Sequence, residues 1–461
     1  YFFKLILKFY LEKYKMINKK LLIKNAIILN EGWINKGDIL IEDEFIVQIE
    51  KSIDSPEAQI IDAKNKYVLP GVIDDQVHFR EPGLTHKATI ATESRAAAAG
   101  GITSFIEMPN TNPQTTTIEK LEDKFEIASK TSFVNYSFMF GGTNDNLEEI
   151  LKVDSKNVAG LKLFLGSSTG NMLVDNPEVL EKIFSSTNLL ISVHCEDEAT
   201  IRNNTKLYTD KYGDDIPIKY HPIIRSEEAC YLSSSKAIEL AKKTGARLHV
   251  FHLSTGKETN LFTNKIPLKD KKITAEVCIH HLWFSDKDYE EKGTHIKWNP
   301  AVKTEADRSQ LWEALLDDRL DVIATDHAPH TLEEKNNVYT KAPSGGPLVQ
   351  HALVAMFEAY HKGKISVEKL VEKMCHNPAI LFQVEKRGYI KEGYFGDIVI
   401  VDDNNPWTVS KDNVLYKCKW SPFEGTTFKS RVTHTLVNGQ LVYENSNFYE
   451  VNAAKRLTFS R

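Results

Sequence analysis

Short apolar stretches alternating with polar residues mark both ends of the chain. Five segments share this texture: KLLIKNAIIL (20–29), GDILIEDEFIVQIE (37–50), AKNKYVLPG (63–71), GYFGDIVIVDD (393–403) and THTLVNGQLVYE (433–444). Alternation of this kind, punctuated by Gly and Asn, is typical of antiparallel strands. The Asn-Gly pair in VNGQ also predicts a hairpin turn. We therefore expect one small β-sandwich domain formed by residues 18–68 and 385–455 together.

The middle of the chain has a different rhythm, in which compact apolar runs recur. They read YVLPGVIDD (67–75), GITSFIEM (101–108), VNYSFMF (134–140), GLKLFLG (160–166), LLISVHC (189–195), RLHVFHLS (247–254), ITAEVCI (273–279) and DVIATDHA (321–328). Helix-compatible stretches such as 119–130 and 227–243 lie between most of them. Eight buried strands alternating with helices predict an α/β fold, a (β/α)8 TIM-like barrel over residues 69–384. A doubly wound open sheet is the alternative, but the first strand is followed by no GxGxxG dinucleotide motif.

Composition narrows the functional classes. The chain has 461 residues, 41% of them hydrophobic, and a net charge of -5, so we expect neither nucleic acid nor an anionic membrane as a partner. Its five cysteines are scattered and show no CxxC spacing, which favours reduced thiols in a cytoplasmic protein over disulfides or a cysteine zinc site. Residues 1–15 make a poor signal peptide and precede Met16, a candidate initiator, so we leave them outside the predicted fold.

Reactive side chains cluster where the predicted barrel strands end. They are Gln76, His78 and Arg80 after the first strand, Asn110 after the second, Lys162 on the fourth, His194 on the fifth, His252 after the sixth, His280 and His281 after the seventh, and Asp326, His327 and His330 after the eighth. A single histidine after a strand is more often a packed or surface residue than a ligand. Repetition over five of eight strands favours an active site, since barrel enzymes carry theirs on this face.

These residue types suit a metal ion. Imidazole and carboxylate groups from His78, His194, His252 and Asp326 are the ligands that a catalytic zinc site uses. Such an ion lowers the pKa of bound water to about 7. Lys162 would repel a metal as an ammonium ion. Two readings stay open for it: a carbamate that bridges two metals, or an ordinary ion pair with Asp326.

The run PGVIDDQVHFREPG (70–83) resembles the first-strand motif of the cyclic amidohydrolases, a family of metal-dependent hydrolases. Within that family, HFREPG together with EMPNT and ATDHAPH is similar to the dihydroorotase branch. GLKLFLG, VHCED, FHLST, EVCIHHL and KWNPAVK follow in the order expected for it. The likeness extends from about residue 20 to the C-terminus, and the composite β domain also matches the family.

The resemblance implies a role for each candidate. Asp326 would be both a metal ligand and the acid/base that shuttles a proton. The shell of one or two zinc ions would be completed by His78, a carboxylated Lys162, His194 and His252. The substrate carboxylate would be bound by Arg80, Asn110 and His330, and the ring would be contacted by Asn299, Gly345 and Gly346. The implied reaction is the reversible hydrolysis of dihydroorotate to N-carbamoyl-aspartate in pyrimidine synthesis. A homo-oligomer is left open.

One position departs from the family pattern. Most members read His-x-His on the first strand, whereas this chain has Gln76 at the first of the two positions. A carboxamide oxygen is a weaker zinc ligand than an imidazole nitrogen. The departure leaves the number of metals and their affinity open, without changing the reaction class.

Two other functions remain alternatives. A hydantoinase or allantoinase would share the metal shell but act on neutral rings, for which a carboxylate-binding trio of Arg80, Asn110 and His330 has no purpose. A catalytically inactive homologue could serve as a structural partner of a transcarbamoylase. Such decay should remove several ligands, and only Gln76 differs here.

Overall fold

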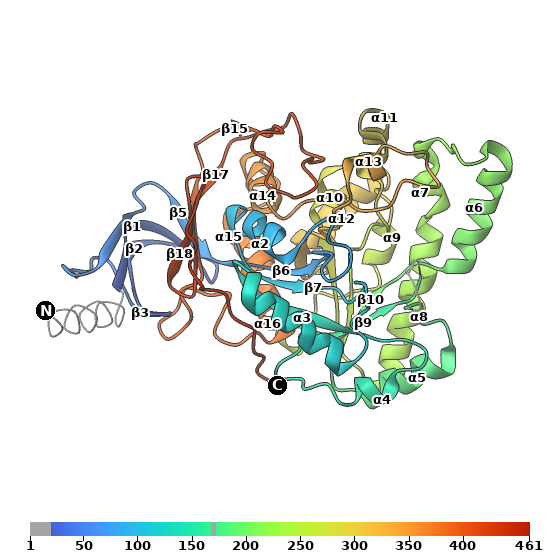
Figure 1. Cartoon of the computed structure of the whole chain (residues 1–461), viewed down its shortest axis with the longest axis horizontal. Coiled ribbons are helices and arrows are strands. Elements are labelled where there is room, and N and C mark those ends of the chain that lie inside the picture. The colour runs from blue at the N-terminus through green and yellow to red at the C-terminus, as the bar shows by residue number, and fades with distance from the viewer. Residues whose placement is uncertain (1–19, 167–171) are drawn as a thin grey trace, which may run out of the picture.

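The computed structural model describes residues 20–166 and 172–461, and these form a barrel joined to a smaller β-sheet unit (Figure 1). The segment 1–15, which the sequence analysis set aside, lies outside the described residues. No helix in the described part of the chain is long and apolar enough to cross a membrane.

The predicted barrel is confirmed. Its eight strands follow in sequence order around one parallel sheet. They are β6 (Val72–Val77), β7 (Ile102–Glu107), β8 (Asn135–Gly141), β9 (Gly160–Phe164), β10 (Ile191–His194), β11 (Leu248–Val250), β12 (Ile273–Cys278) and β13 (Val322–Ala324). A parallel bridge between Val77 and His327 brings the first strand to the last and closes the ring. Nearly every residue of these strands is buried, which explains why they read as continuous apolar runs.

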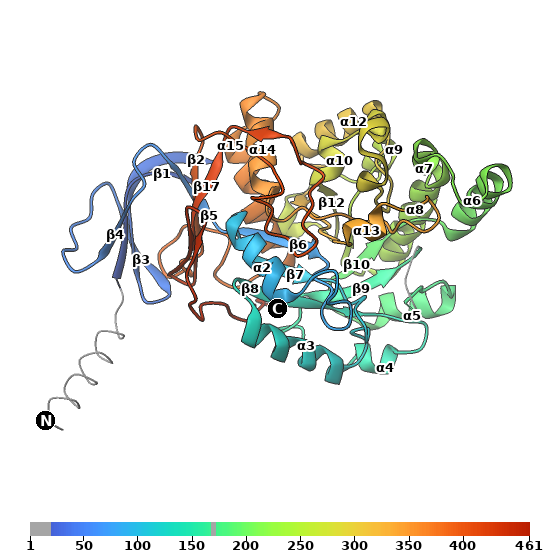
Figure 2. The same cartoon turned by 45° about the horizontal axis from the view of Figure 1, so that its top comes forward.

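Helices surround the barrel strands (Figure 2). They are α2 (Ile90–Ala99), α3 (Ile118–Thr131), α4 (Leu147–Ile150), α5 (Pro177–Ser186), α6 (Glu198–Tyr212), α7 (His221–Ile224), α8 (Glu227–Thr244), α9 (Gly256–Thr259), α10 (Ile279–Trp283), α11 (Tyr289–Lys292), α12 (Glu305–Leu316), α13 (Leu332–Lys335), α14 (Ala352–His361), α15 (Val367–Val371) and α16 (Asn377–Phe382). Both helices that the sequence predicted are observed, α3 and α8. The α8 helix begins where the Ser226 side chain accepts from the backbone of Ala229 and ends at Gly245, whose φ of 76° suits glycine.

The two ends of the chain build one nine-stranded sheet, as the alternation predicted. Its strands are β1 (Lys20–Asn30), β2 (Trp33–Glu42), β3 (Phe45–Glu50), β4 (Gln59–Asp62), β5 (Tyr67–Pro70), β14 (Ile398–Asp402), β17 (Arg431–Val437), β18 (Gln440–Glu444) and β19 (Asn447–Phe448). The N- and C-terminal strands meet where β5 pairs with β14. The VNGQ hairpin is confirmed by the pairing of Val437 with Gln440.

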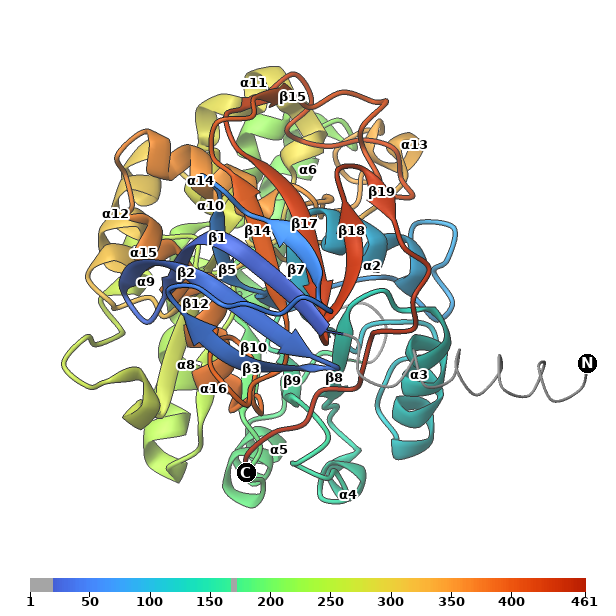
Figure 3. The same cartoon turned by 90° about the vertical axis from the view of Figure 1, so that its left-hand side faces the viewer.

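Figure 3 shows β1, β2 and β3 lying across β14, β17 and β18, so the sheet bends over itself. An aliphatic core separate from that of the barrel fills the bend, with Ile23, Ile39, Ile41, Ile398 and Leu436 among its members. The domain limits of 18–68 and 385–455 stay a prediction. A further pair of short strands, β15 (Trp407–Thr408) and β16 (Thr427–Phe428), lies between β14 and β17 in the sequence.

The first barrel strand is irregular at the point that matters for the site. Its register against β7 shifts between Asp74 and Val77. These two residues are three positions apart on β6, but their partners on β7 are only two positions apart. Such a bulge redirects side chains locally. Gln76 lines a cavity at the ends of the barrel strands, whereas its neighbour Asp75 contacts His249.

Candidate active site

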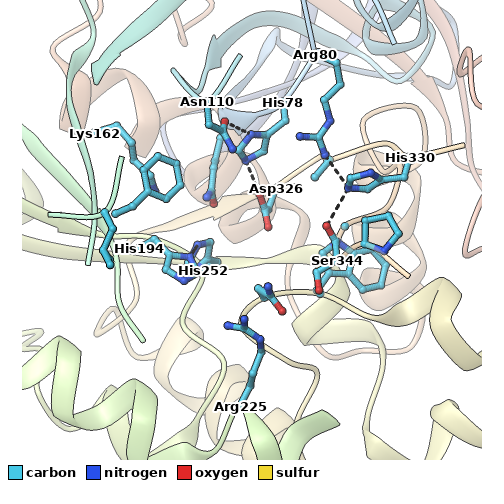
Figure 4. Close-up of a pocket in the computed structure, with 18 of the residues that line it drawn as sticks. His78, Arg80, Asn110, Lys162, His194, Arg225, His252, Asp326, His330 and Ser344 are labelled. Atoms are coloured by element: carbon cyan, nitrogen blue, oxygen red, sulfur yellow. Dashed lines mark hydrogen bonds and ion pairs between the residues drawn. The ribbon is translucent and has the colours of Figure 1, made fainter. Parts of the chain in front are cut away.

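A cavity of about 480 Å³ opens where the barrel strands end. Every residue to which the resemblance assigned a role, except Gly346, lines it: His78, Arg80, Asn110, Lys162, His194, His252, Asn299, Asp326, His330 and Gly345. Figure 4 shows Lys162, His194 and His252 gathered on one side and Arg80, His330 and Ser344 on the other, with His78 and Asp326 between them. The site therefore has two halves: one is rich in side chains that can bind a metal ion, and the other is rich in hydrogen-bond donors. We call them the ligand half and the donor half.

His78 joins the two halves. Its Nδ1 lies 2.8 Å from Oδ1 of Asn110, and since an amide oxygen only accepts, Nδ1 carries the proton. The other ring nitrogen, Nε2, lies 3.1 Å from Oδ1 of Asp326. Burial lowers the pKa of His78 despite the nearby Asp326, which favours the neutral ring. Two acceptors, the Nε2 lone pair and a carboxylate oxygen, thus face each other, an arrangement that fits a bound cation.

His194 and His252 provide a second pair of ring nitrogens that face each other and can act as metal ligands. Nε2 of His194 donates to Glu196 at 3.0 Å, which leaves a lone pair on Nδ1, 3.0 Å from Nε2 of His252. Burial and then His194 lower the pKa of His252, so this ring is neutral too. Nδ1 of His252 is buried without a hydrogen-bond partner among the described residues. The two facing nitrogens can bind one metal ion together.

Lys162 lies on β9 between these histidines and the barrel interior. Its side chain is fully buried, and Nζ has no hydrogen-bond partner in the described chain, so the ion pair with Asp326 considered from sequence is not formed. Burial lowers the pKa of Lys162 to about 7. A substantial fraction of the amine is therefore neutral at neutral pH, and the neutral amine is the form that reacts with carbon dioxide. The environment fits the expected carbamate.

Arg80 dominates the opposite half. Its Nε donates to the backbone oxygen of Pro329 at 3.0 Å, and its Nη2 lies 3.0 Å from Nε2 of His330. Although burial lowers its pKa to about 10, the guanidinium remains cationic at neutral pH. No acidic side chain of the described chain forms an ion pair with it. A buried cation that faces a cavity without a carboxylate partner favours an anionic ligand.

A buried ion pair fixes the backbone that carries His78 and Arg80. Glu107, at the end of β7, accepts from the backbone nitrogen of Phe79 at 2.9 Å. The same carboxylate pairs with Lys124 at 2.9 Å, and both side chains are fully buried. Lys124 also donates to the backbone oxygen of Met108. These bonds tie the ends of the first two strands together.

The glycine pair of APSGGP is divided between two positions. Gly345 has a φ of 127°, and a Cβ there would lie 2.5 Å from the backbone oxygen of Ala328. Only glycine suits that position, so the backbone can approach the cavity closely. Gly346 lies behind it, where its oxygen accepts from the nitrogen of Ala328, and it is not part of the cavity wall. Its predicted contact with a ring stays a prediction.

Several residues of the site were not singled out in the sequence. Glu196, Arg225 and Ser344 are the most important, and Lys87 stands behind His330. Glu196 is fully buried and contacts both His194 and Arg225. Burial alone would raise its pKa, but Arg225 and His194 lower it to about 2. The VHCED motif contained a signal for Glu196, two residues beyond His194; no local pattern marked the others.

His280 and His281 end the seventh strand as predicted but turn away from the cavity. They lie in α10, where His280 stacks on Trp298 at 4.4 Å and His281 bonds to the oxygen of Pro300. Neither lines the cavity. They are packed residues.

A second group of metal-type ligands lies inside the barrel. Asp75, His249 and Glu276 are fully buried, and one ligand atom from each lies within 4.8 Å of the others. Nε2 of His249 is 3.1 Å from Glu276 and 3.6 Å from Asp75. This group could bind a metal ion, or it could share protons between its two carboxylates, because burial raises the pKa of Glu276 to about 8 and that of Asp75 well above its usual value.

The surroundings of Gln76 sharpen an expectation about metal affinity. The side-chain amide oxygen of Gln76 accepts a hydrogen bond from the Cys278 thiol at 3.7 Å. We expect the protein to lose part of its metal readily and Gln76→His to hold it more tightly, since an imidazole nitrogen is the better zinc donor. Asp74 is not readily available to orient the imidazole of the new histidine, because its two oxygens already accept hydrogen bonds from the backbone nitrogen and the hydroxyl of Thr325. Titration of both proteins with a chelator measures this. Equal retention of two metals per chain by the natural protein would contradict it.

We also expect Glu196→Gln to weaken metal binding about ten- to a hundredfold, because a carboxylate that holds a ligating histidine makes it a better donor. Zinc retained at graded chelator concentrations measures the change. A matched control is Glu258→Gln, which replaces another buried carboxylate that accepts from the hydroxyls of Ser234 and Thr255 and lies outside the cavity. Affinity in Glu196→Gln no lower than in the control would show that Glu196 does not act through His194.

Comparison with known proteins places this geometry in context. Residues 67–442 match the model of the amidohydrolase family. The dihydroorotase of Methanosphaera stadtmanae is 31% identical over 94% of this chain and 98% of its own, and that of Halobacterium salinarum is 34% identical over 92% and 96%. Among solved structures, an L-hydantoinase (dihydropyrimidinase) from Arthrobacter aurescens superposes with a TM-score of 0.89 at 28% identity, covering 95% of this chain and 99% of that one. A dihydropyrimidinase from Brevibacillus agri gives 0.86 at 26%, covering 96% and 100%.

Proposed function

The chain belongs to the amidohydrolase family, and within it we propose that this protein is a dihydroorotase, which hydrolyses the cyclic amide of dihydroorotate reversibly to N-carbamoyl-aspartate. The sequence relatives named above, which carry that name, support the proposal. The observation that carries it is the buried Arg80 guanidinium, which faces the cavity and forms no ion pair with a carboxylate of the described chain.

Dihydroorotate is a ring that bears one carboxylate. The carboxylate binds in the donor half of the cavity, where Arg80 offers its guanidinium and His330 an imidazole. Asn110 gives its amide oxygen to His78, so the donor nitrogen of that amide is the group suited to an anion. The scissile amide then lies toward His78 and Asp326, in the middle of the site.

The ligand half fits one or two zinc ions, held by His78, His194, His252, Asp326 and a carboxylated Lys162. When bound, such ions would supply an activated water at neutral pH and Lewis-acid polarisation of the ring carbonyl. Asp326 accepts the proton of the attacking water and returns it to the ring nitrogen as the carbon–nitrogen bond breaks. His78, whose Nδ1–H is fixed by Asn110, keeps its Nε2 directed at Asp326. One proton of the water thus reaches the ring nitrogen through Asp326. The other stays with the hydroxyl that becomes part of the new carboxyl group and is released to solvent when that group ionises.

A hydantoinase is the second candidate, and the solved structures named above favour it. Those enzymes share the fold, at 28% and 26% sequence identity. A hydantoin has no carboxylate, however, and would leave Arg80 buried beside an uncharged ring. An inactive structural homologue is the third candidate. It is disfavoured because His78, Lys162, His194, His252 and Asp326 all face one cavity.

The test is a direct assay of the purified, zinc-supplemented protein in both directions, with dihydroorotate and with N-carbamoyl-aspartate. We expect turnover in each direction and none above background in Asp326→Asn. Absence of turnover from a folded, metal-loaded protein in both directions would reject the proposal.

A further inference from the structure

His330 is held between two basic side chains and a backbone oxygen. Its Nδ1 lies 2.9 Å from Nζ of Lys87, and its Nε2 lies 3.0 Å from both Nη2 of Arg80 and the backbone oxygen of Ser344. The imidazole is almost fully buried. Burial, and then Arg80 and Lys87, lower the pKa of His330, so the ring is neutral and carries a single N–H proton. Which nitrogen carries it decides whether His330 donates to a ligand in the cavity or accepts.

The neighbours of His330 decide between the two tautomers. With the proton on Nε2, that nitrogen donates to Ser344 and Nδ1 accepts from Lys87, so two hydrogen bonds are satisfied. With the proton on Nδ1, an N–H would point at the Lys87 ammonium, two donors would face each other, and Ser344 would lose its donor. Arg80 could then donate to Nε2, a bond that the Nε2–H tautomer lacks because its N–H faces the same Arg80 nitrogen. Nδ1 would lie 3.9 Å from the Glu334 carboxylate, beyond hydrogen-bond distance, so one hydrogen bond would replace two.

We propose that Lys87 is a positioning residue that locks His330 in the Nε2–H tautomer, so that the Nε2–H that donates to Ser344 is also the donor that a substrate carboxylate beside Arg80 would share. Lys87 does not line the cavity, so it acts through His330 and not by touching substrate. The inference rests on the proposed function for the identity of the anion but not for the tautomer itself. Lys87 and His330 are 243 positions apart, and one contact couples the loop after the first strand to the loop after the last.

Lys87 has a second partner that must be separated from this role. Its Nζ also pairs with Glu334 of α13 at 3.0 Å. Glu334 in turn accepts from the backbone of Thr331, one residue after His330. Lys87 could therefore act merely by anchoring this helix. Glu334→Gln removes that ion pair and leaves the Lys87 ammonium beside His330, which makes it the matched control.

The test compares Lys87→Met with Glu334→Gln in the full-length protein. Ring-nitrogen chemical shifts of 15N-histidine-labelled protein report the tautomer, and the His330 signal is identified by its loss in His330→Gln. We expect the Nε2–H tautomer in the natural protein and in Glu334→Gln, and a shift toward Nδ1–H in Lys87→Met. A natural protein with the proton on Nδ1, or a Lys87→Met spectrum identical to it, would overturn the proposal.

The functional readout is a split between binding and turnover. In Lys87→Met we expect the KM for dihydroorotate to rise roughly ten- to a hundredfold, the loss of one hydrogen bond to a charged group, with kcat changed little. Hydrolysis of dihydrouracil, the same ring without the carboxylate, should be unaffected. An equal loss in Glu334→Gln would assign the effect to the helix anchor and reject the proposal. If the tautomer shifts as expected but no variant or natural protein hydrolyses dihydroorotate, the role of Lys87 stands and the proposed function fails.

Discussion

Replacing Asp326 with asparagine is expected to lower kcat for dihydroorotate by at least a hundred- to ten-thousandfold, the usual contribution of a general acid/base. The carboxylate lies 3.1 Å from Nε2 of His78 in the centre of the cavity, so the change also removes an anionic ligand from the metal-binding half. Lost metal binding would add to the lost proton transfer. Turnover of metal-loaded protein under saturating substrate measures the effect.

Asparagine is the informative substitution at this position because of the backbone. Asp326 has a φ of 48°, a left-handed conformation that asparagine adopts more readily than most residues, so the variant should fold where alanine carries extra strain. Asp317→Asn, a partly exposed carboxylate that bonds to Arg319 outside the cavity, is the control. An Asp326→Asn protein that folds, binds metal and keeps most of the natural rate would remove Asp326 from the mechanism.

Arg80→Lys is expected to raise the KM for dihydroorotate about a hundredfold or more, while hydrolysis of a carboxylate-free ring changes far less. The guanidinium donates from Nε to Pro329 and still has its terminal nitrogens for an anion. A lysine ammonium keeps the charge but lacks the planar fork. Two charge-assisted hydrogen bonds are at stake, each contributing about 1.5–3 kcal/mol.

The matched comparison for Arg80 lies in the substrates. Dihydroorotate and dihydrouracil are assayed with the same preparation of Arg80→Lys, so a general loss of structure affects both. A loss of equal size on the two rings would show that Arg80 is structural, through its bond to Pro329, and would favour the hydantoinase alternative.

The sequence predicted the framework of this protein because its signals are local. Barrel strands such as β7 and β9 are buried over their whole length, so each reads as an unbroken apolar run. Once the apolar runs are identified, the strand ends can be predicted, and so can the positions of His78, His194 and Asp326 at those ends. The VNGQ hairpin was equally predictable from its turn residues.

Features that depend on long-range contacts could not be read from the chain. Lys87 touches a histidine 243 positions away, and Arg225, just after α7, reaches Glu196 in the loop after β10. The bulge in β6 redirects Asp75 toward His249, which strict alternation along a strand does not predict. The turn into α10 takes His280 into the packed interior, although its place after a strand resembles that of His252.

The central claim is that this cavity selects a ring carrying a carboxylate, and the ratio of kcat/KM for dihydroorotate to that for dihydrouracil tests it most directly. The two rings differ only in the group that Arg80 and His330 are proposed to bind. We expect the ratio in the natural protein to favour dihydroorotate by about a hundredfold or more, from the same charge-assisted hydrogen bonds. A ratio near one, or a preference for dihydrouracil, would contradict the account.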